Sequence, residues 1–249
     1  MAGDFGKWLG ISDTKMLERK DISVKRKLVR ILMELEEIVE YVEKAKDYPF
    51  FNATISPNDV RLTNIEIAIL SLEDRYFFSH SGLELKAIPR LFKRYFRTRS
   101  LGGISTIEQQ LVRLATGRYE RTFQRKSREL ILAYLLQYHC SKKHLLYCYL
   151  SNSYFGETLN GVDAPSRLIF GKESKDLTWE ESCLIASFLP YPLPRFAIRE
   201  FFEINNVFSS PNDIFSYPPF QKSHWILRVK QRYLYALDRG IIPSNRFKT

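Results

Sequence analysis

The sequence contains no hydrophobic run long enough to cross a bilayer. Its longest apolar stretches, such as residues 67–72 and 183–189, fall far short of the roughly 20 residues that a membrane-spanning helix needs. Residues 1–20 carry acids at Asp4 and Asp13 and no uninterrupted apolar segment, so no secretory signal is visible either. Taken alone, these features predict a chain without a membrane span and favour the cytoplasm.

Cysteine is also scarce. Cys140, Cys148 and Cys183 are an odd number in a large chain and lie in apolar, helix-like stretches, which is typical of reduced core residues and not of a disulfide framework. No cysteine–histidine spacing typical of a metal site accompanies them, and we predict no metal site. The sequence has no internal repeat and no low-complexity tract.

The composition predicts one main globular domain. The chain has 249 residues, 45% of them hydrophobic and 14% aromatic, which is enough for one sizeable core. Lysine and arginine number 38 against 28 acids, a formal charge of +10. Such a surface attracts polyanions, but the sign of the charge does not choose among nucleic acid, anionic lipid and pyrophosphate.

The hydrophobic periodicity predicts a mainly α fold. Apolar residues recur with helical spacing in most segments, whereas strand-like alternation is scarce. Helix starts are expected at two capping boxes, Thr63 with Glu66 and Ser105 with Glu108. The expected helices cover residues 21–46, a segment after 63, a segment from 105 to about 117, and residues 123–139, 142–151, part of 178–189, and 223–239.

The two ends of the chain are expected to be appendages. In the first helix a basic half, residues 20–30, precedes an acidic half, residues 34–43, which is the unfavourable order for the helix dipole, so packing or a partner must hold it. Prolines 190, 192 and 194 suggest the end of the compact domain. We therefore divide the chain into an N-terminal helical extension (1–59), a central domain (60–195) and a C-terminal extension (196–249) to which we assign no chemistry.

Two adjacent carboxylates and a histidine form the first stretch with possible chemistry, from Glu73 to Gly82. Glu73 and Asp74 end an apolar helix, where the negative end of the helix dipole suits a proton acceptor. His80 follows in an expected turn. On local grounds a solvated helix end followed by a turn histidine is the simpler interpretation, so the stretch needs support from elsewhere.

Two further stretches are polar. A glycine pair at 102–103 leads into an expected helix start whose free N–H groups suit a phosphate. The capping box explains Ser105 and Glu108 without a ligand, but not Gln109 and Gln110.

The last stretch is Arg125-Lys126-Ser127-Arg128-Glu129. Its bases suit a pyrophosphate, and Glu129 lies one turn from Arg125 and Lys126. Locally, an exposed helix face with an Arg125–Glu129 pair is the simpler interpretation.

Taken in order, the three stretches resemble the signature motifs of family 51 glycosyltransferases, found in bifunctional penicillin-binding proteins and in monofunctional peptidoglycan transglycosylases. The motif E-D-x-x-F-x-x-H-x-G is matched at Glu73, Asp74, Phe77, His80 and Gly82. The motif G-x-S-T-x-x-Q-Q is matched at Gly103, Ser105, Thr106, Gln109 and Gln110, and R-K-x-x-E at Arg125, Lys126 and Glu129. Weaker matches extend the resemblance over about residues 60–195.

The resemblance implies a lysozyme-like, two-lobed helical domain that extends a lipid-pyrophosphate-linked glycan with lipid II. Glu73 would be the base that deprotonates the acceptor 4-hydroxyl during inverting attack on the donor. Arg125 and Lys126 would stabilise the departing pyrophosphate. The second acid, Glu129, would position Lys126 or a divalent cation, Mg or Mn, although the resemblance makes no cofactor a firm requirement. The remaining implied substrate-binding residues are Asp74, His80, Ser105, Thr106, Gln109 and Gln110.

The sequence departs from the family pattern at three positions. Leu114, Tyr147 and Ser151 stand where family members usually carry asparagine, glutamate and asparagine, and these changes are expected to weaken substrate binding. Members are also normally tethered by a membrane helix at the outer (periplasmic) face of the cytoplasmic membrane. Here a peripheral membrane contact, together with lipid II and the growing glycan strand, is the expected set of partners.

Two alternatives stay open. A lysozyme-like muralytic enzyme would share a helical fold and a catalytic glutamate, but it has no pyrophosphate to bind with Arg125 and Lys126. A catalytically weak or idle homologue would bind lipid II or glycan without turnover. A nucleic-acid binder is suggested only by the basic composition and lacks any recognisable reading motif.

Overall fold

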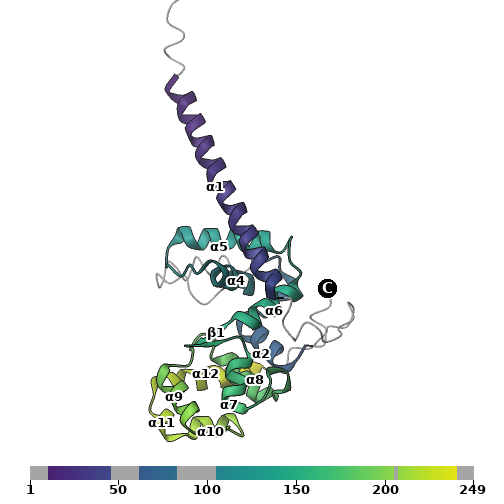
Figure 1. The fold of residues 1–249 in the computed structure, drawn as a ribbon, viewed down its shortest axis with the longest axis vertical. Helices are drawn as coiled ribbons and strands as arrows, with labels where there is room; N and C mark the ends of the chain where they lie inside the picture. Colours follow the sequence, from purple (N-terminus) through teal and green to yellow (C-terminus); the bar gives the residue numbers. More distant parts are fainter. Residues whose placement is uncertain (1–10, 46–61, 83–104, 205–206, 240–249) are drawn as a thin grey trace, which may run out of the picture.

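The computed structural model describes residues 11–45, 62–82, 105–204 and 207–239, with side chains from residue 25 onward. Gly103 of the second motif, the glycine at 102 and the tryptophan-containing segment 1–10 lie outside these ranges. Within them the chain is mainly helical, as predicted (Figure 1). The elements are α1 (Ile11–Lys44), α2 (Asn64–Glu73), η3 (Phe77–Ser79), α4 (Ile107–Thr116), α5 (Phe123–Leu136), α6 (Lys142–Asn152), β1 (Tyr154–Gly156), β2 (Leu159–Asn160), α7 (Asp163–Phe170), η5 (Ser174–Asp176), α8 (Trp179–Ser187), α9 (Arg195–Ile204), α10 (Pro211–Ser216), α11 (Pro218–Gln221) and α12 (His224–Arg239).

The helices form two groups, consistent with the expected lysozyme-like, two-lobed arrangement. In one group α1, α4, α5 and α6 pack on one another, and in the other α2 and α12 pack on α8. Figure 1 displays the first group in the upper half of the molecule and the second in the lower half. The β1–β2 hairpin follows α6 directly, and the buried side chains of both groups belong to one continuous hydrophobic cluster.

Local signals set several helix ends as predicted. Thr63 and Glu66 form a capping box at the start of α2, with the Thr63 N–H donating to Glu66 Oε2 at 2.6 Å. Gly117 ends α4 in the left-handed conformation with φ 62°, which suits glycine. Thr178 and Glu181 form a second capping box at the start of α8, which was not predicted from the sequence.

Other boundaries differ from the prediction. α1 begins at Ile11, ten residues before the expected start. α5 ends at Leu136 instead of residue 139, because the chain turns there, with Tyr138 N donating to Leu135 O at 3.0 Å. The short helices α7, α9, α10 and α11 and the hairpin were not predicted from the sequence.

The C-terminal half of α1 is held by packing, as its charge order requires. Leu35, Ile38 and Val42 are buried in the common core. The carboxylate of Glu34 pairs with Arg118 at 2.9 Å and with Arg128, so α1 is fastened to the α4–α5 region by charge as well as by apolar contact. No helix within the described ranges combines the length and apolarity that crossing a bilayer requires.

The prolines at 190, 192 and 194 end α8 without ending the packed core. Trp225 of α12 donates from its indole nitrogen to Tyr191 O at 3.0 Å, and its ring stacks on Phe188. Val229 and Tyr233 are buried in the same cluster as α2 and α8. The boundary at 195 stays a prediction about domain organisation, but residues 207–239 share the core of the central domain.

Candidate active site

Glu73 is the last residue of α2, and two other helices determine where its carboxylate lies. Its Oε2 accepts a hydrogen bond from Gln110 Nε2 of α4 at 3.0 Å, and its Oε1 pairs with Arg232 of α12. The side chain keeps 13% of its surface exposed, so solvent and substrate can reach it. A mostly buried carboxylate with fixed partners and one open side is suited to accept a proton from a bound hydroxyl.

Gln110 is itself held in one orientation. The hydroxyl of Tyr149 on α6 donates to Gln110 Oε1 at 2.8 Å, which leaves the amide nitrogen to donate to Glu73. Burial raises the pKa of Tyr149 well above 10, so its hydroxyl keeps the proton that it donates. The structure thus brings Glu73 and Gln110, from the first and second motifs, into direct contact.

Arg232 was not predicted from the sequence as a site residue. Besides Glu73, this side chain reaches Leu72 O at 3.3 Å, and Arg239, two turns later on α12, donates to Ser71 O at 2.8 Å. Both arginines therefore meet the C-terminal end of α2, where the helix dipole favours cations. The available signal in the sequence was that the helix expected at residues 223–239, to which we assigned no chemistry, is rich in basic residues.

Asp74 and His80 form a buried pair beside the site. The Asp74 carboxylate lies 2.9 Å from His80 Nε2 and accepts the backbone N–H of Ile107, the first residue of α4, at 3.0 Å. Their side chains are only 4% and 7% exposed. These contacts tie the end of α2 to the start of α4 and leave neither group facing open solvent.

The predicted capping box at the start of α4 is wrong. Thr106, not Ser105, is the N-cap residue, and its hydroxyl accepts from Gln109 N at 3.4 Å and donates to Gly82 O at 2.9 Å. Glu108 points inward and pairs with Lys142. The motif offers two adjacent hydroxyls, and the approach of Gly82 selects the second as the cap.

Gly82 lies in close approach to another helix. Its φ is +71°, and a Cβ at this position would lie 2.3 Å from the carbonyl oxygen of Ala133 on α5. Glycine is therefore needed for both reasons. Through Gly82, the first motif contacts the second at Thr106 and the helix of the third at Ala133.

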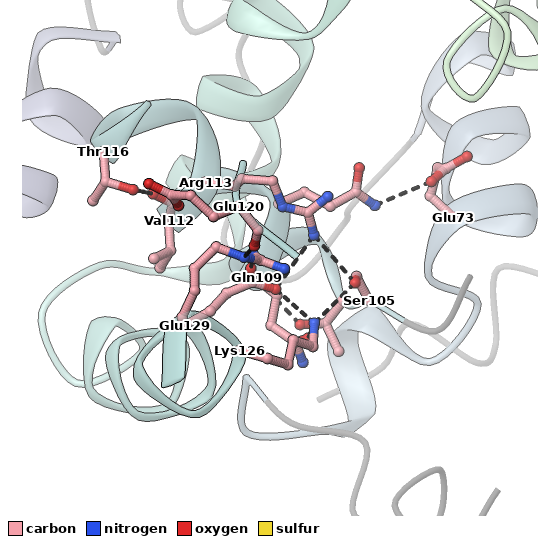
Figure 2. A network of polar contacts seen from close by, with 12 residues as sticks. Glu73, Ser105, Gln109, Val112, Arg113, Thr116, Glu120, Lys126 and Glu129 are labelled. Atoms are coloured by element: carbon pink, nitrogen blue, oxygen red, sulfur yellow. Dashed lines mark hydrogen bonds and ion pairs between the residues drawn. The ribbon is translucent and has the colours of Figure 1, made fainter. Parts of the chain in front are cut away.

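Three cationic side chains contact the carboxylate of Glu129 on α5, within the polar network that Figure 2 displays. Lys126 Nζ lies 2.6 Å from Glu129 Oε1, Arg125 pairs with Oε2, and Arg113 NH2 lies 3.3 Å from Oε1. Ser105 Oγ bridges the cluster by accepting from Lys126 at 3.1 Å and from Arg113 at 3.2 Å. We call Arg113, Arg125, Lys126 and Glu129 the cationic cluster, because three positive groups share one carboxylate.

Lys126 makes three contacts with its ammonium group. Besides Glu129 and Ser105, it donates to Gln109 Oε1 at 2.6 Å, so Gln109 belongs to the same network. Burial lowers the pKa of Lys126, while the adjacent Glu129 carboxylate acts in the opposite direction. A lysine held this firmly is arranged in advance to act on an anion, and an incoming phosphate would compete with Glu129 for it.

Arg113 is the second cation that was not predicted from the sequence. It lies on α4, six residues after the start of that helix, and outside the three matched motifs. Its contacts with Ser105 and Glu129 make it part of the cationic cluster. A basic residue one turn beyond Gln109 was the available signal.

A second group of buried charges lies at the start of α4. Ligand-type atoms of Asp74, His80 and Glu108 lie within 4.8 Å of one another. Lys142 pairs with Glu108 and lies 4.4 Å from the ring centroid of Phe77. Burial raises the pKa of Glu108, and the Lys142 charge opposes that change. We interpret this group as an ion-pair cluster that joins α2, α4 and α6.

A cavity of about 410 Å³ borders both halves of the site. Gln110, the partner of Glu73, and Arg113, a member of the cationic cluster, both line it. The other lining residues are Leu114, Tyr119, Tyr149, Ser153, Tyr154 and Leu189. A cavity of this size with aromatic walls and a few polar groups is suited to a small ligand or part of a larger one.

Of the three departures from the family pattern, only Leu114 lines this cavity. Tyr147 is 6% exposed in the core, and burial raises its pKa to about 12. Ser151 donates to Tyr147 O at 2.8 Å on α6.

The segment that contains these residues is similar to known proteins. A family model described as transglycosylase matches residues 50–203. The chain is 34% identical over 146 residues to penicillin-binding protein 1F of Bacillus subtilis, covering 58% of this chain and 20% of that protein. It is 35% identical over 131 residues to a biosynthetic peptidoglycan transglycosylase of Haemophilus influenzae, covering 52% and 53%. A protein of the same name from Mannheimia succiniciproducens is 30% identical over 158 residues, covering 64% of each.

The alignments thus span a fifth of one relative and about half to two thirds of the two others. The family match, in contrast, covers more than half of this chain and includes every matched motif position. The chain therefore belongs to the transglycosylase family.

Proposed function

We propose that this protein is a peptidoglycan glycosyltransferase that polymerises lipid II-type disaccharide-pyrophosphate-polyprenol into glycan strands with inversion. The observation that carries the proposal is the position of one cavity between two chemical groups. Gln110 connects the cavity to the carboxylate of Glu73, and Arg113 connects it to the cationic cluster. In the proposed reaction the acceptor hydroxyl needs a base on one side of the cavity, and the donor pyrophosphate needs cations on the other.

Glu73 is the proposed base. Its carboxylate is held by Gln110 and Arg232 and receives the proton of the acceptor 4-hydroxyl as that oxygen attacks the donor anomeric carbon. The new glycosidic bond forms as the bond between the anomeric carbon and the pyrophosphate oxygen breaks. Polyprenyl pyrophosphate leaves with the bonding electron pair.

The cationic cluster is the proposed site for the leaving pyrophosphate. Charge develops on that group as the bond breaks, so cations fixed in advance by Glu129 lower the barrier more than they strengthen ground-state binding. Lys126, Arg125 and Arg113 supply these cations. Glu129 then acts by positioning them.

A divalent cation near the pyrophosphate stays a prediction. Glu129 is the carboxylate of the cluster, and both of its oxygens already contact Arg125, Lys126 or Arg113. In this arrangement Glu129 has no oxygen left to bind a metal, and three cations surround it, so we derive no step through a metal.

The remaining motif residues divide into two proposed roles. Ser105 and Gln109 contact Lys126, so they belong to the phosphate subsite, and Gln110 lies where the acceptor sugar must approach Glu73. Thr106, Asp74 and His80 are occupied by contacts within the fold. Their proposed contribution to binding is to position α4 relative to α2.

The lipid-linked substrate implies work at a membrane surface. The outer face of the cytoplasmic membrane, with a peripheral contact and the growing glycan strand as second partner, is the proposed location. The relatives named as peptidoglycan transglycosylases support this assignment.

The experiment is polymerisation of labelled lipid II in detergent by the purified chain. Wild type should form glycan polymer, Glu73→Gln should form none, and Lys126→Ala should lower turnover by at least about a hundredfold. Glu203→Gln, on the exposed side of α9, is the matched control and should retain activity.

A folded wild-type chain that binds lipid II without making polymer would refute the enzyme and leave the idle homologue. Release of soluble fragments from preformed glycan would favour the muralytic enzyme.

A further inference from the structure

α1 presents an apolar strip just before it reaches the rest of the protein. Leu28, Val29, Leu32 and Met33 are each 51–58% exposed. Residues four apart lie on the same side of a helix, so the 28–32 and 29–33 pairs form one continuous strip. Figure 1 displays α1 running past α5 and away from the body of the molecule. Single exposed apolar side chains are ordinary, but a contiguous patch marks an interaction surface.

Positive charge accompanies this apolar strip. Lys25, Arg26, Lys27 and Arg30 are all exposed, and the sequence has no acid from Ile22 to Met33. On a helix of 3.6 residues per turn, Arg26 and Arg30 lie next to Met33 along one edge of the strip. A helix that combines an apolar face with adjacent lysine and arginine is suited to the headgroup region of an anionic bilayer.

The strip is rigidly connected to the domain. Immediately after Met33, Glu34 pairs with Arg118 and Arg128, and Leu35 and Ile38 enter the core. The helix is continuous from Ile11 to Lys44, so a surface that binds the strip has a fixed orientation relative to α4 and α5. Arg128 is the neighbour of Glu129, so the fastening point of α1 adjoins the cationic cluster on α5.

We propose that the strip formed by Leu28, Val29, Leu32 and Met33, with its adjacent basic residues, docks this protein on an anionic lipid bilayer. A second copy of the chain is the less favourable occupant, because two strips face to face would bring their basic residues together. The choice of a lipid partner rests on the proposed function, in which the substrate is a membrane lipid. The exposed strip itself does not depend on that function.

Vesicle flotation of the purified full chain tests the proposal. Wild type should bind vesicles containing phosphatidylglycerol, bind phosphatidylcholine vesicles at least about tenfold more weakly, and lose affinity as salt is raised. Leu32→Glu/Met33→Glu should lower the affinity for phosphatidylglycerol vesicles by at least about tenfold. Arg26→Glu/Arg30→Glu should do the same, since each basic residue contributes about fivefold.

The matched controls change two apolar or two basic residues to glutamate elsewhere on the protein. Leu227→Glu/Leu234→Glu changes two leucines of α12 that are 50% and 52% exposed, and Arg199→Glu/Lys222→Glu reverses two exposed charges. Both controls should float like wild type. Wild type that does not bind phosphatidylglycerol vesicles, or a Leu32→Glu/Met33→Glu variant that binds them undiminished, overturns the proposal.

Two further measurements distinguish docking on lipid from self-association and from the catalytic activity. Sedimentation without vesicles shows whether the strip pairs two chains. If Leu32→Glu/Met33→Glu abolishes self-association but still binds vesicles, the lipid assignment is overturned. Polymerisation of lipid II in detergent micelles, which needs no docking on a bilayer, tests the proposed function separately. Vesicle binding without polymerisation would sink the proposed function and leave the docking surface standing.

Discussion

Arg232 of α12 pairs with Glu73 of α2 across 159 residues of sequence. The same guanidinium reaches Leu72 O, so it contacts both the proposed base and the helix end that carries it. Gln110 meets the other oxygen of the Glu73 carboxylate. The proposed base is therefore oriented from two sides, by a helix of each group.

We expect Arg232→Met to lower the turnover of lipid II by about tenfold, because Glu73 Oε1 loses the partner that fixes its direction; a tenfold change corresponds to about 1.4 kcal/mol of transition-state free energy. The rate of polymer formation with saturating lipid II measures it. Arg228→Met on the same helix is the control, since Arg228 lies over the Tyr191 ring and not at Glu73. Equal turnover of wild type and Arg232→Met would show that Gln110 alone positions the base.

The close approach of Gly82 to α5 predicts a difference between two glycine substitutions. Gly82→Ala should lower the free energy of unfolding by about 3 kcal/mol or more, because the new Cβ meets Ala133 O and also strains a positive φ. Gly117→Ala has a similar φ of +62° but nothing within 4 Å of the new Cβ, so it should cost only about 1 kcal/mol. Urea unfolding of both variants compares them directly. Equal losses would mean that the backbone at Gly82 moves away from α5.

Buried Glu108 predicts a stability that depends on pH. Its folded pKa is raised above 4.5 by burial, so the folded state holds the proton more tightly than the unfolded state. The resulting stabilisation is fully present below the unfolded pKa and is lost as pH rises through the folded pKa. Relative to wild type, Glu108→Gln should therefore become progressively more stable as pH rises from about 4 towards 7.

Thermal or urea unfolding across that pH range measures the effect of Glu108. Lys142→Met is the informative companion, because the Lys142 charge opposes the effect of burial on the Glu108 pKa. Removing this charge should widen the pH-dependent loss in a chain that keeps Glu108. A difference between wild type and Glu108→Gln that stays constant with pH would contradict the prediction.

The departures from the family pattern should differ in their consequences. Leu114→Asn changes a residue that lines the cavity, so we expect a change in KM for lipid II of about tenfold with little loss of stability. Tyr147→Glu would bury a second carboxylate near Glu66, whose charge already contributes to the raised pKa of Tyr147. It should destabilise the fold by about 3 kcal/mol or more without improving binding. Steady-state kinetics and thermal unfolding of both variants decide between these roles.

The sequence by itself determined those features that depend on neighbours within about one helical turn. The capping boxes at Thr63 and Thr178, the end of α4 at Gly117 and the Arg125–Glu129 pair each need residues at most a few positions apart. Such contacts form wherever the helix forms, because its geometry brings residues three and four apart together. The order and spacing of the motifs also indicated the family before any packing was known.

Only the tertiary structure decided which groups meet across the chain. Arg113 and Arg232 became part of the site through packing of α4 on α5 and of α12 on α2. Thr106 became the cap of α4 because Gly82 accepts a hydrogen bond from its hydroxyl, leaving Ser105 to contact Lys126. These choices depend on distances between segments far apart in sequence, which local periodicity and capping rules do not contain.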